Sequence, residues 1–249
     1  MRERGSHVVS PLALLLGVVA LAGCSGGATA TQAQKTWLYH GQEGITVTLE
    51  VADASLYRQL LPEAFAMPER LVAAVAMASY YDVVAPLVPY REGYVLLACS
   101  YQGRSGWYTV TMPVDDQVAN DGGRAMGFPK YVADRIDLAE SGGTWSGQVV
   151  RGGVTAMQMT FTPLPTAQLV AGTGDAPLPL FNLLPPGTGP AVTEVRVAID
   201  GQRQVQALAG TATVAAGAGE SWAGLLVGAT ALSAQYERIS GSYTLELVQ

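Results

Sequence analysis

Short stretches of alternating apolar and polar residues, each followed by turn residues, run through most of this chain. In one of them Ile45, Val47, Leu49 and Val51 alternate with polar neighbours, which is the period of a β-strand with two different faces. Similar runs lie near residues 70–80, 94–102, 107–114, 131–138, 144–150, 153–162, 192–199, 203–212 and 241–248. So many short strands predict a mainly β (α+β) barrel or sandwich, and closure into a barrel would remove exposed strand edges.

Helical segments are expected to be few and short. The segment Asp53–Leu61 begins with a capping residue and stops before Pro62. Further helices are predicted over 116–126 and within 221–233. The segment 164–190 is rich in proline and has no strand alternation, so it is expected to be a long ordered crossing or a flexible loop.

The first residues resemble an export signal rather than part of the folded domain. Arg2 and Arg4 precede an apolar run, 8–22, that is shorter than the roughly 20 residues of a membrane span and fits a signal peptide. The run ends in Leu-Ala-Gly-Cys24, which resembles the bacterial lipobox, whose cysteine is acylated. An ordinary secretory signal with a cysteine nearby is the alternative.

This pattern predicts three regions: a lipoprotein signal peptide over 1–23, a flexible tether over 24–35 that begins at lipidated Cys24, and a folded domain over 36–249. We therefore expect an exported protein of the bacterial cell envelope, held to the membrane by its N-terminal lipid on the periplasmic or cell-surface side.

Composition narrows the function classes. With 49% hydrophobic and 14% charged residues, the chain suits a packed globular domain. Its formal charge of −6 argues against a nucleic-acid surface, because phosphate binding needs clustered Lys and Arg. The two His and two Cys exclude most zinc sites, so no metal is expected. Cys99 lies in an apolar run and is interpreted as a small buried residue rather than a nucleophile.

Lysine usage singles out one residue. Lys35 and Lys130 are the lysines of the chain, and Lys35 belongs to the tether. Pro129 restricts its own φ and favours an extended Phe128, so Lys130 follows a defined turn into a strand. Met126, Phe128, Tyr131 and Val132 could supply apolar walls. A surface lysine at a strand start is the alternative.

The segment around Lys130 resembles the acetoacetate decarboxylase family. The matching motifs are Gly103, Gly106-Trp107-Tyr108, Met112-Pro113-Val114-Asp115, Gly123-Arg124, Gly127-Phe128-Pro129-Lys130, Leu60-Leu61-Pro62-Glu63 and Tyr90-Arg91-Glu92, with weaker matches over 178–185 and 240–243. The resemblance implies a closed antiparallel β-barrel or cone with a few short helices. Family members form multimers, so it also implies a possible homo-oligomer.

The resemblance implies a Schiff-base mechanism. The family lysine, here Lys130, forms an imine with a β-keto acid, and the iminium accepts the electrons left behind by carbon dioxide. An ordinary lysine is neutral in only about 0.04% of molecules at pH 7, so its pKa must be lowered. Acetoacetate decarboxylase is itself a known case of such activation. Glu92 matches the family's active-site acid, with a turn carboxylate as the alternative. No metal or organic cofactor is implied.

Three departures from the family leave the reaction open. The family's second lysine is replaced by Tyr131, no arginine lies near 42–45 to receive the substrate carboxylate, and Ala125 stands where the family has glutamate. A lowered Lys130 pKa must then come from desolvation or from Arg124. The candidate pocket residues are Arg124, Tyr131, Phe128 and Met126. We expect a Schiff-base-forming lyase for a small keto acid. The alternatives are an aldolase-dehydratase using the same lysine, a non-catalytic lipid-anchored ligand-binding protein and a structural envelope component.

Overall fold

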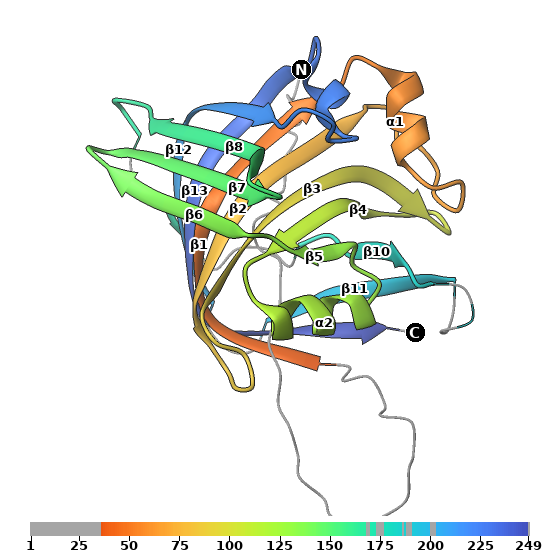
Figure 1. Cartoon of the computed structure of the whole chain (residues 1–249), viewed down its shortest axis with the longest axis horizontal. Coiled ribbons are helices and arrows are strands. Elements are labelled where there is room, and N and C mark those ends of the chain that lie inside the picture. The colour runs from red at the N-terminus through yellow and green to blue at the C-terminus, as the bar shows by residue number, and fades with distance from the viewer. Residues whose placement is uncertain are drawn as a thin grey trace, which may run out of the picture.

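The computed structural model describes residues 36–167, 170–172, 177–185, 187, 191–199 and 203–248. Its strands form a continuous sheet in which one part closes on itself (Figure 1). The closed part runs through β1 (Thr36–Glu50), β2 (Val72–Val83), β3 (Tyr90–Tyr101), β4 (Arg104–Val114), β10 (Leu180–Leu183), β11 (Val192–Ile199) and β13 (Thr230–Val248). β13 pairs back with β1, which completes the barrel and confirms the expected architecture.

Most neighbouring strands are antiparallel, as expected, and the pairings of β4 with β10 and with β5 (Lys130–Val132) are parallel. β12 (Gln204–Ala216) leaves the barrel beside β13 and continues into β8 (Val154–Pro163), β7 (Thr144–Arg151) and β6 (Arg135–Ser141). The short β9 (Val170–Gly172) pairs with β12. β6 contacts β2 and β3, so this outer layer covers part of the barrel wall (Figure 1).

Alternation along the strands separates two buried layers. On β2, Ala74, Ala76, Ala78 and Tyr80 belong to a cluster shared with the other inward-facing barrel residues. The intervening Ala73, Val75 and Met77 pack in a second cluster with residues of β6, β7 and β8. Because the outer layer covers β2 and β3, most residues of these two strands are buried on both faces.

The same alternation explains β1. Ile45, Val47 and Leu49 form a buried face in the outer cluster, as the sequence pattern predicts. The polar residues between them do not face water, because Thr46 and Thr48 are 1% and 2% exposed. A polar strand face thus lies inside a closed barrel, and this polar interior is where a site can form.

The two helices begin at their predicted caps. α1 (Ala54–Leu60) follows Asp53, whose carboxylate accepts a hydrogen bond from the Leu56 N–H at 2.9 Å. α2 (Gln117–Ala125) follows Asp116, which accepts from the Ala119 N–H at 2.8 Å. These side chains satisfy N–H groups that the first helical turn leaves without partners.

The helical piece predicted within 221–233 is a 3₁₀ helix, η1 (Ala223–Leu226), which ends before Gly228 turns the chain with φ +69° and β13 begins at Thr230, opposite Glu50. Another sequence prediction is wrong. The expected crossing or loop over 164–190 contains the barrel strand β10, which pairs with β4 and β11. Four residues are too few to show a strand period.

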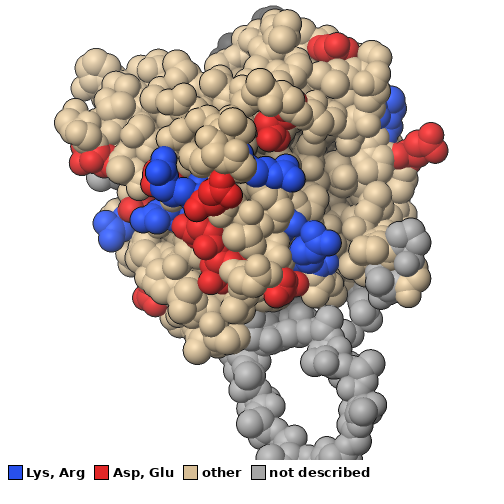
Figure 2. Space-filling model, in the orientation of Figure 1, with Lys and Arg blue, Asp and Glu red and all other residues tan. Residues whose placement is uncertain are grey.

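Cys99 is 3% exposed in the outer cluster, and burial raises the pKa of its thiol to about 12. This position confirms the predicted small buried residue, and a raised pKa disfavours the reactive thiolate. On the face shown in Figure 2, basic and acidic side chains are interspersed and most of the surface is uncharged. Among the described residues, no helix combines the length and apolar character needed to cross a bilayer. The predicted signal peptide and tether, with Cys24, lie outside the described residues.

Candidate active site

The turn after α2 delivers Lys130 to the barrel interior. Gly127 adopts φ +90°, a conformation that favours glycine, and the Phe128 N–H donates to the Gly123 carbonyl at 3.1 Å. Lys130 then starts β5 opposite Met112 of β4. A Cβ atom at Gly123 would overlap the aliphatic chain of Lys130, so glycine at this position gives the lysine its path.

Lys130 and Glu92 meet inside the barrel. The side chains of both residues are 0% exposed, and Lys130 Nζ lies 2.8 Å from Glu92 Oε2. The other carboxylate oxygen, Oε1, accepts a hydrogen bond from the Tyr80 hydroxyl at 2.9 Å. Nζ also lies 5.7 Å from the centre of the Tyr90 ring, on its face. The two residues predicted as catalytic from the sequence are therefore direct partners, although 38 positions separate them.

Burial shifts the pKa of each partner in the direction that favours its neutral form. It lowers the pKa of Lys130, while the nearby Glu92 carboxylate opposes this effect. Burial likewise raises the pKa of Glu92, and Lys130 opposes that change. Transfer of one proton from Nζ to Glu92 would give a neutral amine beside a neutral acid, without leaving an isolated charge in the interior.

Buried tyrosines surround this pair. The hydroxyls of Tyr39 and Tyr90 are hydrogen-bonded at 2.7 Å, and the Tyr39 ring packs 5.0 Å from the ring of Tyr80 and 4.9 Å from that of Tyr243. Tyr243 donates a hydrogen bond to the Gln42 side chain. Burial raises the pKa of these phenols well above the ordinary value, so their hydroxyls stay protonated and can donate hydrogen bonds.

Sequence reasoning missed these tyrosines as site residues. A signal was present, because Tyr90, Glu92 and Tyr94 occupy alternate positions of one strand and therefore share a face. That face could be recognised as the barrel interior only once closure of the sheet was known.

The other predicted pocket residues divide into two groups. Met126 and Phe128 are 0% and 2% exposed and belong to the inner cluster, as apolar walls would. Arg124 is exposed, and its Nη1 donates to the Lys130 backbone carbonyl at 3.1 Å. Burial is the main cause that lowers the Lys130 pKa, and Arg124 is not among the causes. The Tyr131 ring lies under the Arg151 guanidinium at 4.3 Å and packs with the outer cluster, so it is not brought to the Lys130 ammonium.

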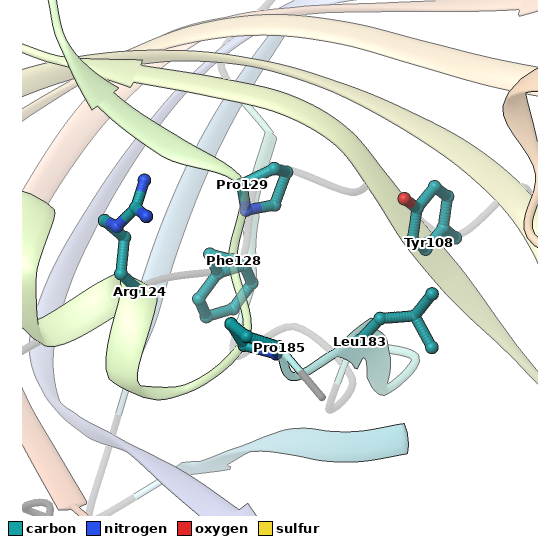
Figure 3. A pocket seen from close by; sticks show the side chains of 7 residues that line it. Tyr108, Arg124, Phe128, Pro129, Leu183 and Pro185 are labelled. Carbon is teal, nitrogen blue, oxygen red and sulfur yellow. The ribbon is translucent and has the colours of Figure 1, made fainter. Parts of the chain in front are cut away.

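A cavity of about 210 Å³ borders the turn that carries Lys130 (Figure 3). Arg124, Phe128 and Pro129 line it together with Tyr108, Gly127, Leu183 and Pro185. Figure 3 shows the Tyr108 hydroxyl pointing from β4 into this space. Lys130 is not among the residues that line the cavity.

Within the described part of the chain, no group of three or more His, Cys, Asp and Glu side chains could hold a metal ion. The groups that meet around Lys130 are an amine, a carboxylate and phenols. An amine that can lose its proton to an adjacent base can add to a carbonyl carbon.

Comparison with solved structures places this barrel among known folds. An acetoacetate decarboxylase from Legionella pneumophila subsp. pneumophila str. Philadelphia 1 is 19% identical, with a TM-score of 0.68 over 94% of this chain and 98% of that one. An acetoacetate decarboxylase-like enzyme from Sphingomonas wittichii RW1 is 19% identical, with a TM-score of 0.65 over 92% and 100%. An enduracididine biosynthesis enzyme complexed with pyruvate is 18% identical, with a TM-score of 0.66 over 89% and 91%.

At these identities the structural likeness shows the fold. No curated protein sequence gave a significant match. The sequence model of the family described as acetoacetate decarboxylase (ADC) matches residues 26–247, which is most of the chain. The protein therefore belongs to the acetoacetate decarboxylase family.

Proposed function

We propose that the protein is a Schiff-base-forming lyase that acts on a small β-keto acid or a related keto compound, with Lys130 as its nucleophile. The observation that carries the proposal is the fully buried contact of 2.8 Å between Lys130 Nζ and Glu92 Oε2 in a closed barrel. A surface lysine would remain protonated in water, whereas desolvation favours the neutral amine that the chemistry needs.

The reaction begins with proton transfer from Nζ to Glu92. The neutral amine adds to the ketone carbon, and loss of water from the carbinolamine gives an iminium. The bond to the carboxylate then breaks, carbon dioxide leaves, and the electron pair of that bond moves into the iminium to form an enamine. Protonation of the enamine carbon and hydrolysis return the ketone and free Lys130. The iminium is the electron sink, so the scheme requires no metal or organic cofactor.

Glu92 is the acid-base group of this scheme. It lies within direct proton-transfer distance of Nζ, and the Tyr80 hydroxyl holds its second oxygen at 2.9 Å. The buried phenols near it are neutral donors suited to the oxygen of a carbonyl or carbinolamine. Tyr131, in place of a second lysine, adds no positive charge, so desolvation must supply the activation of Lys130.

Borohydride trapping tests the proposal. The purified full chain is incubated with acetoacetate or pyruvate, reduced with sodium borohydride and mapped by mass spectrometry. A stable adduct at Lys130 is expected, with loss of the adduct in Lys130→Met. Lys35→Arg is the matched control, because it removes the other lysine, and it should leave the adduct unchanged. The absence of an adduct with every keto compound tried would favour a non-catalytic ligand-binding protein.

Product analysis separates the reactions that share this imine. Release of carbon dioxide from acetoacetate is expected for the lyase. Condensation of pyruvate with an added aldehyde, without carbon dioxide release, would identify an aldolase-dehydratase instead. Both outcomes use Lys130, so they test the reaction rather than the nucleophile.

We also propose, from the sequence alone, that the mature protein is anchored in the cell envelope through acylated Cys24. The lipobox-like segment and the low apolar content of residues 25–35 support a lipid anchor followed by a tether. A homo-oligomer is a further proposal, based on the family resemblance.

A further inference from the structure

Arg203 is a buried cation outside the pair described above. It is 2% exposed and is among the largest fully buried side chains of the described chain. Among the described residues, its Nη1 has no hydrogen-bond partner. A guanidinium presents several N–H donors and stays charged in proteins, so a buried donor without an acceptor is costly unless a ligand satisfies it.

Arg203 lies beside β13, at the point where the neighbouring strand on one edge of β13 changes from β11 to β12. On one edge of β13, Tyr243 pairs with Ile199 of β11, and Ser240 pairs with Gln204 of β12. Arg203 immediately precedes Gln204, where the edge passes from β11 to β12. Val205, two residues farther along, packs against the inner cluster, as does Ile199. Alternation therefore points Arg203 to the barrel interior.

Inside the barrel, a series of buried residues lies between Arg203 and Lys130. Tyr243 and Glu237 are the groups whose charge acts on Arg203, and they oppose the lowering of its pKa by burial. Tyr243 is itself influenced by both Arg203 and Glu92. Its ring stacks on Tyr39 at 4.9 Å, and Tyr39 packs on Tyr80, which binds Glu92. Contacting phenols thus extend from Tyr243, whose charge acts on Arg203, to the Lys130–Glu92 pair.

We propose that Arg203 binds the carboxylate of the substrate, so that the site selects anionic oxo acids over neutral ketones. The planar fork of arginine matches the two oxygens of a carboxylate, and a charge-assisted hydrogen bond at this buried position would satisfy Nη1. The inference rests on the proposed function, because the carbonyl of the same substrate must reach Lys130. The charge of Glu237 acts on the same guanidinium and limits its net attraction for anions.

The test compares a carboxylate substrate with a neutral analogue. Borohydride adducts at Lys130 are measured against the concentration of acetoacetate and of 2-butanone, in which a methyl group replaces the carboxylate. Arg203→Gln is expected to raise the half-maximal concentration of acetoacetate about tenfold, with less than a twofold change for 2-butanone. Arg203→Lys should lie between wild type and Arg203→Gln, since it keeps the charge and loses the fork. The matched control, Arg196→Gln, removes a surface arginine and should change neither value.

A second measurement does not depend on the imine. Propionate has no ketone, and it is expected to raise the thermal unfolding temperature of wild type and of Arg196→Gln but not of Arg203→Gln. If no keto compound is trapped in wild type, the lyase proposal fails and this measurement alone decides the role of Arg203. If Arg203→Gln does not fold, propionate protection of wild type, reduced in Arg203→Lys, supports the role. Equal weakening of both trapping probes, or no protection of wild type by propionate, would overturn it.

Discussion

Lys130 and Glu92 have opposite charges when ionised, and burial disfavours both ionised forms. Lys130 keeps a partner at 2.8 Å, so the pair avoids the cost of an isolated buried charge. Each partner also sets the proton affinity of the other, because Glu92 opposes the lowering of the Lys130 pKa. The readiness of the amine to react is therefore a property of the pair.

Glu92→Gln tests this coupling through pH. Removing the carboxylate charge removes the influence that raises the pKa of Lys130, so that pKa should fall further. We expect the pH midpoint of imine trapping to move down by about one unit or more. Turnover should fall because the proton acceptor is lost. The pH dependence of the borohydride adduct measures the shift, and an unchanged midpoint would contradict a direct action of Glu92 on the amine.

The same variant has a consequence for stability. Between the lowered pKa of Lys130 and its ordinary value of 10.5, the unfolded chain binds the proton and the folded chain does not, so stability increases with pH. In Glu92→Gln this window should begin at lower pH. Glu50→Gln is the control, since Glu50 pairs with Arg70 on the surface and should leave the window unchanged.

At the scale of elements, α2 and the turn after it position the lysine. Asp116 caps α2, and the same residue raises the pKa of Lys130 through its charge. α1 has an equivalent cap at Asp53, which is not among the groups that act on Lys130. A comparison of the two caps can therefore distinguish a loss of helix stability, which both would cause, from a change in the Lys130 pKa, which only Asp116 would cause.

Asp116→Ala and Asp53→Ala are expected to destabilise the protein by about 1 kcal/mol each, because both remove a cap. Only Asp116→Ala should shift the pH midpoint of imine trapping, and the shift should be downward, because a negative charge near Lys130 is lost. Chemical denaturation measures the first effect and trapping measures the second. An equal shift in both variants would mean that stability alone governs trapping.

At the scale of the whole molecule, the closed barrel encloses the buried Lys130–Glu92 pair. Closure of β13 onto β1 gives both edges of the barrel wall a partner. The outer layer covers the apolar outer faces of β2 and β3, while their inner faces carry Tyr80 and Glu92 among apolar residues. That arrangement suits a site that needs desolvated charges.

The anchor proposal predicts how the full-length protein distributes between phases. Expressed in a bacterium that processes lipoproteins, wild type should partition into the detergent phase of Triton X-114 and carry an acylated Cys24 by mass spectrometry. Cys24→Ser should move to the aqueous phase, because the added acyl chains supply the membrane affinity. Cys99→Ala, which changes the buried cysteine, should stay with the detergent. Wild type in the aqueous phase would contradict the anchor.

Much of the fold could be predicted from the sequence, because strand alternation and helix caps are local. The caps at Asp53 and Asp116 and most strand positions follow from neighbours along the chain. β10 could not be predicted in this way, since Leu180 is a strand residue through its partners Trp107 and Val195. The helical piece predicted after Ser221 is short, because Gly228 turns the chain and β13 pairs with β1 from Thr230 onward.

The sequence by itself determined the periodic strands, the Gly-Phe-Pro-Lys130 turn and, through the family motifs, Glu92 as the candidate partner. Tertiary structure alone decided which face of each strand became the interior. It also brought Tyr39, Tyr243 and Arg203, from distant parts of the chain, to the same buried wall. The physical reason is that burial, hydrogen-bond satisfaction and proton affinity depend on neighbours in space, and barrel closure creates those neighbours.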